Sequence, residues 1–468
     1  MRKYLDRIAI VVVALCVVPM AAWMVSAQAA QGGAQQKAPS YTMPEYNQFT
    51  ACQAEKDPTS KVKCLDGFVS QFPNSTLMQY VYVIYYQTYY QLKDFKKAID
   101  YADKLVALGD KADLASRVSA EEFRVQVFPY AYTSKDPDYQ DQLTKQRDAA
   151  LQAVKLLQQY KAEPNSKLGD ADFKKYMGVD YAAAGNADLQ LKDNTDAVQA
   201  FKSALDNNAN DALTEYHLGL AYLALTPPQS LDGFWALGRA VDLKVPDADK
   251  VKDYLRRAVL AYEQPGCVPQ VDPQLTDLLQ MAANSPQRPA TWTIPSADDL
   301  NKIRQSSNIL TVIQTLGAGG DNAKQTWLAI CGAEFPEVVG KIIDVNKSDN
   351  YVDFMVYSGA TAQEMQAATM ANMDVKVWTA PPPPGTAPAA PAAGTATQGG
   401  AAAAAPQITP QPDVLRMQKD DGIRFSGTLV SYDPSPFLLH WDDVKVDPSI
   451  IPEKAAPGKR APHRVPAK

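Results

Sequence analysis

Apolar residues recur at a helical spacing along the first two thirds of the chain. From Tyr41 to about Leu316 they fall at i, i+3, i+4 and i+7, and polar turn clusters such as "FPNS", "KDPDY", "AEPNS" and "DNNAND" interrupt them. This pattern is typical of amphipathic helices joined by tight turns. We therefore expect this part of the chain to be entirely α-helical.

The pattern changes to strict alternation from Val338 onward. Five segments rich in β-branched and aromatic residues follow: "VVGKIIDVN", "YVDFMVY", "DVKVW", "GIRFSGTLVSY" and "FLLHWDDVKV". The third and fourth are separated by an Ala/Pro/Gly-rich tract, residues 380–412, which lacks the apolar pattern of a packed element and is expected to be disordered. Five short strands predict a small all-β barrel over residues 336–452.

Residues 266–335 lie between these two patterns. A proline-spaced connector runs from "CVPQVDP" to "RPATWTIP", and two helices are expected after it. The first, "SADDLNKIRQSSNILTVIQTL", begins with Ser296 and Asp299 at capping-box spacing, and the second is "GAGGDNAKQTWLAICG". We expect these helices to bridge the helical part and the barrel.

Both ends of the chain have a composition unlike that of a folded domain. In residues 1–30, Arg2, Lys3 and Arg7 precede the apolar run "IAIVVVALCVV", and small residues follow in "SAQAA". This order predicts a signal peptide, or an N-terminal membrane anchor if cleavage after Ala27 or Ala29 fails. The protein is thus expected to be exported, periplasmic or envelope-associated, and to touch a membrane only through this segment. Residues 453–468 form a basic, proline-rich tail that we expect to be disordered.

Four cysteines follow the leader, namely Cys52, Cys64, Cys267 and Cys331. An even number in an exported chain favours disulfides. Cys52 and Cys64 each lie six residues from Pro58, where a turn would set two helices antiparallel with both thiols facing. Whether Cys267 pairs with Cys331 stays open. A metal site lacks nearby histidines and CxxC spacing, so no metal is expected.

The helical part contains an internal repeat. In "AAAGNADLQLKDNTDAVQAFKSAL" and the following "YHLGLAYLAL", Ala184 and Gly185 precede Leu218 and Gly219 by 34 residues. The pattern resembles the tetratricopeptide repeat (TPR) family, through Tyr181, Ala184, Gly185, Ala197, Phe201 and Ala204 in one unit, Leu218, Gly219, Tyr222 and Ala240 in the next, and Tyr82, Tyr85, Tyr89, Ala98 and Leu105 in a weaker earlier copy.

The resemblance implies a mainly α architecture, a TPR-like solenoid over residues 41–265 with about five helical hairpins and a concave groove. Members of the family are non-enzymatic scaffolds that bind a protein or peptide, so an unidentified partner of this class is expected. The family's groove positions correspond here to Tyr80, Gln87, Tyr90, Asn186, Leu189, Tyr216 and Leu223. The lysine with which some members clamp a peptide carboxylate is replaced by Val83, Ala182 and Tyr216.

The strand segments resemble the OB-fold, in the tRNA-anticodon-binding-like version found in exported proteins. This resemblance suggests an alternative function, the binding of single-stranded nucleic acid or polysaccharide through Trp378 and Trp441. Charge disfavours nucleic acid, because the chain carries a net charge of −6 and residues 336–452 hold seven basic against thirteen acidic side chains. Exposure of the two tryptophans beside lysines or arginines would favour the alternative, and burial would remove it.

The sequence offers little support for an enzyme. His217 lies in the apolar "YHLGLAYLAL" without a serine, cysteine or aspartate at catalytic spacing, so we interpret it as a structural or groove residue. The glycine-rich "GAGGD" lacks the strand, loop, helix and lysine of a phosphate site. We therefore expect neither catalysis nor a cofactor.

Overall fold

The computed structural model describes residues 41–264, 267–381 and 409–454. The chain divides into two compact units, Met1–Lys252 with Leu279–Pro289 and Asp253–Leu278 with Ala290–Lys468. We call them the helical unit and the barrel unit. The predicted signal segment 1–30, most of the tract 380–412 and nearly all of the basic tail lie outside the described residues.

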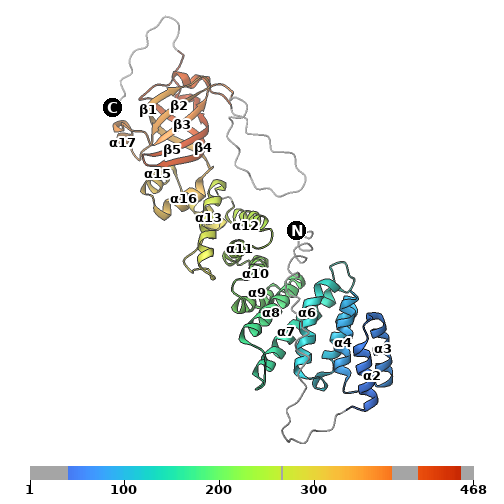
Figure 1. Ribbon diagram of the computed structural model, residues 1–468. Coiled ribbons are helices and arrows are strands. Elements are labelled where there is room, and N and C mark those ends of the chain that lie inside the picture. The colour runs from blue at the N-terminus through green and yellow to red at the C-terminus, as the bar shows by residue number, and fades with distance from the viewer. Residues whose placement is uncertain (1–40, 265–266, 382–408, 455–468) are drawn as a thin grey trace. The chain divides into compact units, whose positions relative to one another are not determined.

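The helical unit is a succession of antiparallel helical hairpins (Figure 1). Its hairpins are α2 (Met43–Ala54) with α3 (Pro58–Gln71), α4 (Met78–Gln91) with α5 (Phe95–Val106), α6 (Leu114–Ala131) with α7 (Tyr139–Ala162), α8 (Asp170–Leu191) with α9 (Asn194–Asn207), and α10 (Ala212–Ala224) with α11 (Ser230–Asp242). Consecutive helices pack on each other throughout. The prediction of a helical first part is confirmed.

Polar caps and small residues set the geometry of these hairpins. Thr42 and Glu45 form a capping box at the start of α2, and Asp57 accepts a hydrogen bond from the Ser60 backbone at the start of α3. Gly219 of α10 faces α11 so closely that an added Cβ would lie 2.7 Å from Leu237 Cγ. The absence of a side chain there lets the two helices of this hairpin approach each other.

Two further helices follow, α12 (Ala248–Glu263) and α13 (Val268–Asn284), and the division between the units falls within them. The proline spacing predicted a connector where α13 lies, and this prediction is wrong. The prolines of "CVPQVDP" fall in the first two turns of α13, and Pro273 is the one inside the helix. A proline this close to the start of a helix removes few backbone hydrogen bonds, and the later turns of the helix are unaffected.

The barrel unit contains a closed five-stranded barrel in the order β1-β2-β3-β5-β4. Its strands are β1 (Glu334–Lys347), β2 (Tyr351–Tyr357), β3 (Met373–Trp378), β4 (Gly422–Pro434) and β5 (Phe437–Val446), with the short helix α17 (Ala362–Ala367) between β2 and β3. All neighbours are antiparallel except β3 and β5, which run parallel. The five predicted strand segments coincide with these strands, and a mainly α fold with a small C-terminal barrel is confirmed.

Three helices share the core of the barrel. They are α14 (Ala297–Ser306), α15 (Ile309–Ala318) and α16 (Gly320–Ile330), and Figure 1 shows α15 and α16 at one end of the barrel. Leu300, Val312 and Trp327 pack in one cluster with barrel residues such as Phe354. The predicted capping box at Ser296 is present, but Asn308 caps a new helix where one continuous helix was expected. These helices thus form part of the barrel unit's core.

Candidate functional site

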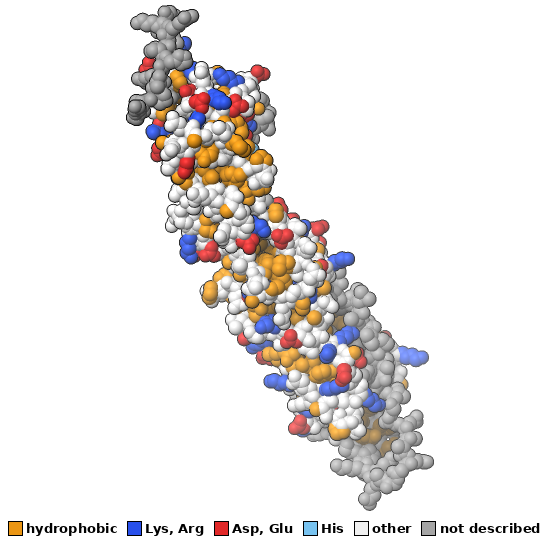
Figure 2. Space-filling view, turned by 90° about the vertical axis from the view of Figure 1, so that its left-hand side faces the viewer, with side chains coloured by type: hydrophobic (Ala, Val, Ile, Leu, Met, Phe, Trp, Pro, Cys, Tyr) orange, Lys and Arg blue, Asp and Glu red, His pale blue; other side chains and the backbone are white. Residues whose placement is uncertain are grey.

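Exposed tyrosines mark the first helices of the first three hairpins. Tyr46 on α2, Tyr80 and Tyr90 on α4, and Tyr130 on α6 are each between 39% and 42% exposed. Together with Phe95 we call them the aromatic surface. In the view of Figure 2, hydrophobic side chains reach the surface in separate patches among polar ones. Large aromatic rings left in solvent are unusual for helices that could bury them, so this surface is the candidate site.

The aromatic surface is most continuous around Tyr90. The Tyr90 ring lies 5.5 Å from Phe95 and 5.9 Å from Phe123, and Phe95 lies 5.4 Å from Tyr130. These rings come from α4, α5 and α6, so hairpin packing creates the cluster. A shallow cavity of about 340 Å³, widely open to solvent, lies beside it and is lined by Leu92, Lys93, Asp94, Phe95, Lys96, Tyr130 and Ala131.

Two lysines at or near this cavity are paired with aspartates. Lys96 Nζ lies 2.6 Å from Asp136 Oδ1, and Lys97 Nζ lies 2.9 Å from Asp94 Oδ2. The hydrogen bond with Asp136 raises the pKa of Lys96, and the same bond lowers the pKa of Asp136 to about 2. Lys93 also lines the cavity and has no acidic partner among the described residues, so the cavity offers a ligand two aromatic rings, Phe95 and Tyr130, beside one unbalanced positive charge.

The other end of the surface is at Tyr80. Its ring lies 6.4 Å from Phe49 of α2, and burial raises the pKa of its hydroxyl, with the nearby Asp113 adding to the effect. The side-chain oxygen of Gln79 accepts a hydrogen bond from the Asp113 backbone at 2.8 Å. Tyr80, Gln87 and Tyr90 follow one face of α4, so one helix carries the surface between its two ends.

The remaining predicted groove residues, from Asn186 to Leu223, lie on later hairpins. They are half-buried, as is Gln87. Leu189 packs against the core around Phe201. Leu223 packs on Gly233 of α11, where an added Cβ would lie 2.8 Å from Leu223 Cγ. The structure therefore brings Tyr80, Gln87 and Tyr90 together and keeps Asn186, Leu189, Tyr216 and Leu223 apart from them. Their role in a groove stays a prediction.

The repeat pattern does not identify Tyr46, Phe95, Phe123 and Tyr130. The repeat register covers only units that match the family pattern, and α6, which carries two of these rings, has no matching motif. An indirect signal exists in "VFPYAYTSKDPDY", where aromatic residues follow a proline just before a turn.

Other tyrosines of α4 are structural. Tyr85 and Tyr86 are buried, Tyr85 Oη donates to Asp66 Oδ1 at 2.6 Å, and its ring stacks on Tyr101 at 4.0 Å. Burial is the main cause that raises the pKa of Tyr85. Tyrosines of one helix thus divide between the core, where the hydroxyl has a partner, and the aromatic surface.

His217 shows no catalytic arrangement. Its ring lies 5.8 Å from Phe201 and 5.4 Å from Tyr216. Burial lowers the pKa of His217 to about 4, so the imidazole is neutral at physiological pH. Its surroundings are apolar and aromatic, which fits the structural interpretation.

The two barrel tryptophans are buried. Trp441 packs edge-on between Phe335 and Phe425, with centroids at 5.4 Å from each, and Trp378 Nε1 donates to Asp442 at 3.4 Å. One cation, Lys376, lies 5.8 Å from the Trp378 ring centroid. Burial beside an aspartate removes the feature that would favour nucleic-acid or polysaccharide binding through these rings.

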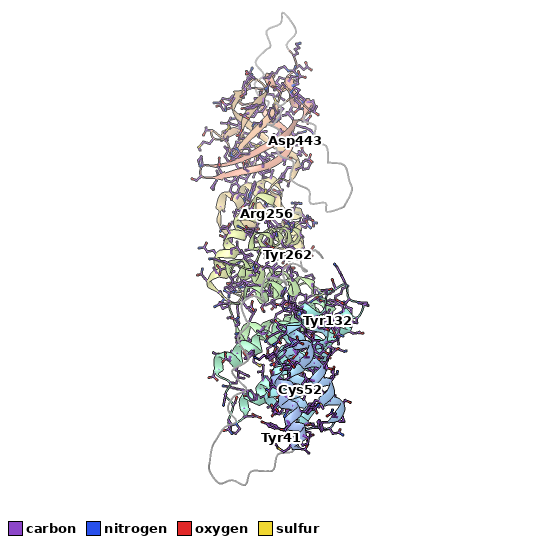
Figure 3. The ribbon with its side chains drawn as sticks, turned by 45° about the vertical axis from the view of Figure 1, so that its right-hand side comes forward. Tyr41, Cys52, Tyr132, Arg256, Tyr262 and Asp443 are labelled. Atoms are coloured by element: carbon purple, nitrogen blue, oxygen red, sulfur yellow. A yellow bond between two sulfur atoms is a disulfide. The ribbon has the colours of Figure 1, made fainter. Side chains whose placement is uncertain are left out.

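Two disulfides are present. Cys52 joins Cys64, and Cys267 joins Cys331; the Cα atoms of each pair are 5.3 Å apart, and Figure 3 labels Cys52. The first pairing was predicted, and the second settles the one left open. Such bonds persist in oxidising compartments. Within the described ranges no group of three or more His, Cys, Asp or Glu side chains is placed to hold a metal, and no helix there combines the length and apolarity of a membrane span.

Comparison with protein-family models and with curated proteins finds no match. Among solved structures, the chain is similar to the C-terminal part of a TPR repeat-containing protein from Cytophaga hutchinsonii, at 15% identity and a TM-score of 0.23. The similarity covers 51% of this chain and 91% of that one. A TM-score of this size does not establish a shared fold.

Proposed function

We propose that this protein is an exported, non-enzymatic scaffold of the TPR type that binds a protein or peptide partner through the aromatic surface. The observation that carries the proposal is the row of exposed tyrosines on α2, α4 and α6. Tyrosine combines a large apolar face with few rotatable bonds, and it is enriched where interfaces bind most strongly.

The chemistry of the surface indicates the kind of partner. Phe95 and Tyr130 line the cavity, Tyr90 packs on Phe95, and Lys96 and Lys97 are paired with aspartates. A partner segment with one or two large apolar side chains would fill this cavity, and its backbone would lie along the tyrosines. An extended or helical peptide segment has this form.

Export rests on the leader composition together with the disulfides. Cys52–Cys64 and Cys267–Cys331 account for every cysteine after the leader. A cytosolic chain would keep such thiols reduced. The bacterial periplasm or envelope is therefore the proposed location.

We infer that the barrel is OB-like, since a closed five-stranded barrel with a parallel β3–β5 pair follows the strand order of that fold. Its binding of nucleic acid or polysaccharide remains the alternative function. Buried Trp378 and Trp441 speak against it.

The test compares partner capture from the native envelope by wild type and by variants. Tyr90→Ala and Tyr130→Ala should each weaken binding of the captured protein by about 1 to 3 kcal/mol while the melting temperature barely changes. Tyr80→Ala and Tyr216→Ala test the two ends of the predicted groove. Leu151→Ala, an exposed apolar residue on α7, is the matched control and should bind like wild type. Tyrosine variants that unfold, or that bind like the control, would refute the assignment.

A further inference from the structure

Two carboxyl groups are sealed between α6 and α8. Glu122 on α6 is 3% exposed, and Asp180 on α8 is 0% exposed. The two groups act on each other both as charges and as hydrogen-bond partners. Among the described residues, no N–H or hydroxyl donates to any of their four oxygens. Two buried carboxylates without donors would be very costly.

The neighbouring cation is engaged elsewhere. Arg124 Nη1 lies 2.6 Å from Asp103 Oδ2 of α5, and its Nη2 donates to Gln142 of α7 at 3.4 Å. Glu121, the residue before Glu122, acts on Asp103 and Arg124, and its negative charge also acts on Asp180. No positive charge in the described part of the chain acts on the pair itself.

The charge that α7 brings to α8 lies away from the pair, since Arg147 Nη1 is 3.8 Å from Asp188 Oδ1 and is not among the groups that act on Glu122 or Asp180. The other contacts of these helices near the pair are between neutral groups. From α7, Gln146 Nε2 donates to the backbone oxygen of Val125 at 3.2 Å. From α4, the Tyr86 hydroxyl lies 3.4 Å from Ser119 Oγ. Gln126, one turn after Glu122 on α6, acts on Glu122 but does not complete a hydrogen bond to either of its oxygens. Burial is the largest cause that raises the pKa of both Glu122 and Asp180. A proton held between the carboxyls supplies the missing donor, because the O–H of one can donate to the other.

We propose that Glu122 and Asp180 form a proton-sharing latch between α6 and α8, closed while the pair holds its proton and opened as the pH rises. Opening releases that proton to water and leaves two hydrated carboxylates. The helix α6 also carries Phe123 and Tyr130, so an open latch would disturb the aromatic surface. The latch itself stands independently of the proposed function.

The direction of the pH effect follows from linkage. In the opened seam, each carboxyl has an ordinary pKa of about 4 to 4.5, whereas the closed pair keeps a proton to higher pH. Between these two pKa values, the opening constant rises about tenfold per pH unit. The contribution of the latch to stability is therefore complete at low pH and is lost as the pH rises through the raised pKa.

Hydrogen exchange of the full chain between pH 5 and pH 8, corrected for the intrinsic exchange rate, measures this opening. Amides of α6 and α8 should lose about tenfold in protection per pH unit within the window, whereas the disulfide-linked hairpin α2–α3 serves as the reference and should not. Equal pH dependence in both regions of the wild-type protein would overturn the latch.

Isosteric variants test the sharing of one proton. Glu122→Gln and Asp180→Asn each supply an amide donor, so each alone should flatten the pH dependence at α6 and α8, and the double variant should add little. Glu121 is also buried and its pKa is raised to about 8, so Glu121→Gln measures the separate share of that carboxyl in the pH dependence. Asp172→Asn, an exposed carboxyl on α8, is the matched control and should retain the slope. The pair would be two independent carboxyls if each single variant kept the wild-type pH dependence of protection at α6 and α8, or if the effects of the two substitutions simply added in the double variant. If Glu122→Gln does not fold, Asp180→Asn and the wild-type series still decide the question.

Discussion

The two units use aromatic residues in opposite ways. The barrel closes on itself, and its rings at Trp441, Phe335 and Phe425 pack against one another inside. The hairpins of the helical unit have no such closure, and Tyr80, Tyr90 and Tyr130 stay in solvent although Tyr85 and Tyr86 of the same unit are buried. The architecture decides where an aromatic side chain is available to a partner, because an open stack has faces that no neighbouring element covers.

The sharpest way to break this comparison is to remove one ring from each unit. Trp441→Ala should destabilise the barrel unit by about 3 to 5 kcal/mol, because it deletes a large buried side chain and leaves a cavity. Tyr90→Ala, at the surface, should cost well under half of that. Urea unfolding followed by tryptophan fluorescence and by far-UV circular dichroism measures both. Equal losses in the two variants would mean that Tyr90 is a core residue.

The two disulfides should contribute different amounts of stability, because they close loops of different length. Cys267–Cys331 spans 64 residues in the barrel unit, and Cys52–Cys64 spans 12 in the first hairpin. In the chain-entropy account, losing the longer link costs about 4 kcal/mol and losing the shorter one about 3 kcal/mol. Double Cys→Ala variants of each pair, unfolded in urea under oxidising conditions, give the two values. The order of the two losses is the decisive result, and its reversal would contradict the loop-length argument.

Close packing inside one hairpin gives a smaller effect. Gly219→Val should destabilise the helical unit by roughly 1 to 3 kcal/mol, because its Cβ would meet Leu237 Cγ at 2.7 Å and the Gly233 backbone oxygen at 3.0 Å. Gly67→Ala on α3 is the matched control, since its Cβ would meet no atom nearer than 3.6 Å, and it should stabilise that helix slightly. Thermal unfolding of wild type and of both variants measures these changes in stability. A neutral Gly219→Val would show that α10 and α11 can separate without loss.

Sequence patterns predicted those features of the fold that depend on neighbours along the chain. Helical periodicity, the strand segments and the capping box at Ser296 all follow from local spacing, as does the Cys52–Cys64 pairing across one turn. The partner of Cys267 depends on how α13 and α16 are brought together, and spacing alone contains no such information. The proline spacing of "CVPQVDP" is also typical of a connector, but Pro269 falls in the first turn of α13, where proline removes no helical hydrogen bond, and Pro273 in the second turn removes only one.

The candidate site was predictable only in part for the same reason. The repeat register identified Tyr80 and Tyr90, because it assigns each position of a matching helix to a face. Phe95 and Tyr130 join them through packing between α5 and α6, which no motif of the sequence describes. The carboxyl pair of Glu122 and Asp180 was equally hidden, since an acidic residue in a helical pattern is normally assigned to the solvent face.

The smallest expected effect concerns His217, and it distinguishes a structural histidine from a functional one. Because burial lowers the pKa of His217 to about 4, the folded protein keeps this ring neutral at a pH where the unfolded chain, with a pKa near 6.5, already binds a proton. Its contribution to stability is thus complete above about pH 6.5 and is lost as the pH falls toward 4. For this half-buried ring, the loss in the free energy of unfolding by pH 5 should be about 1 to 2 kcal/mol.

The variant His217→Gln tests this expectation. At pH 7.5 its free energy of unfolding should match that of wild type within roughly 0.5 kcal/mol. As the pH falls to 5, it should lose less stability than wild type does, because glutamine does not bind a proton. Urea titrations at pH 7.5, 6 and 5 measure the difference. A variant that follows wild type at all three values would show that the imidazole is not desolvated, and a loss of partner binding at pH 7.5 with unchanged stability would move His217 from the core to the binding surface.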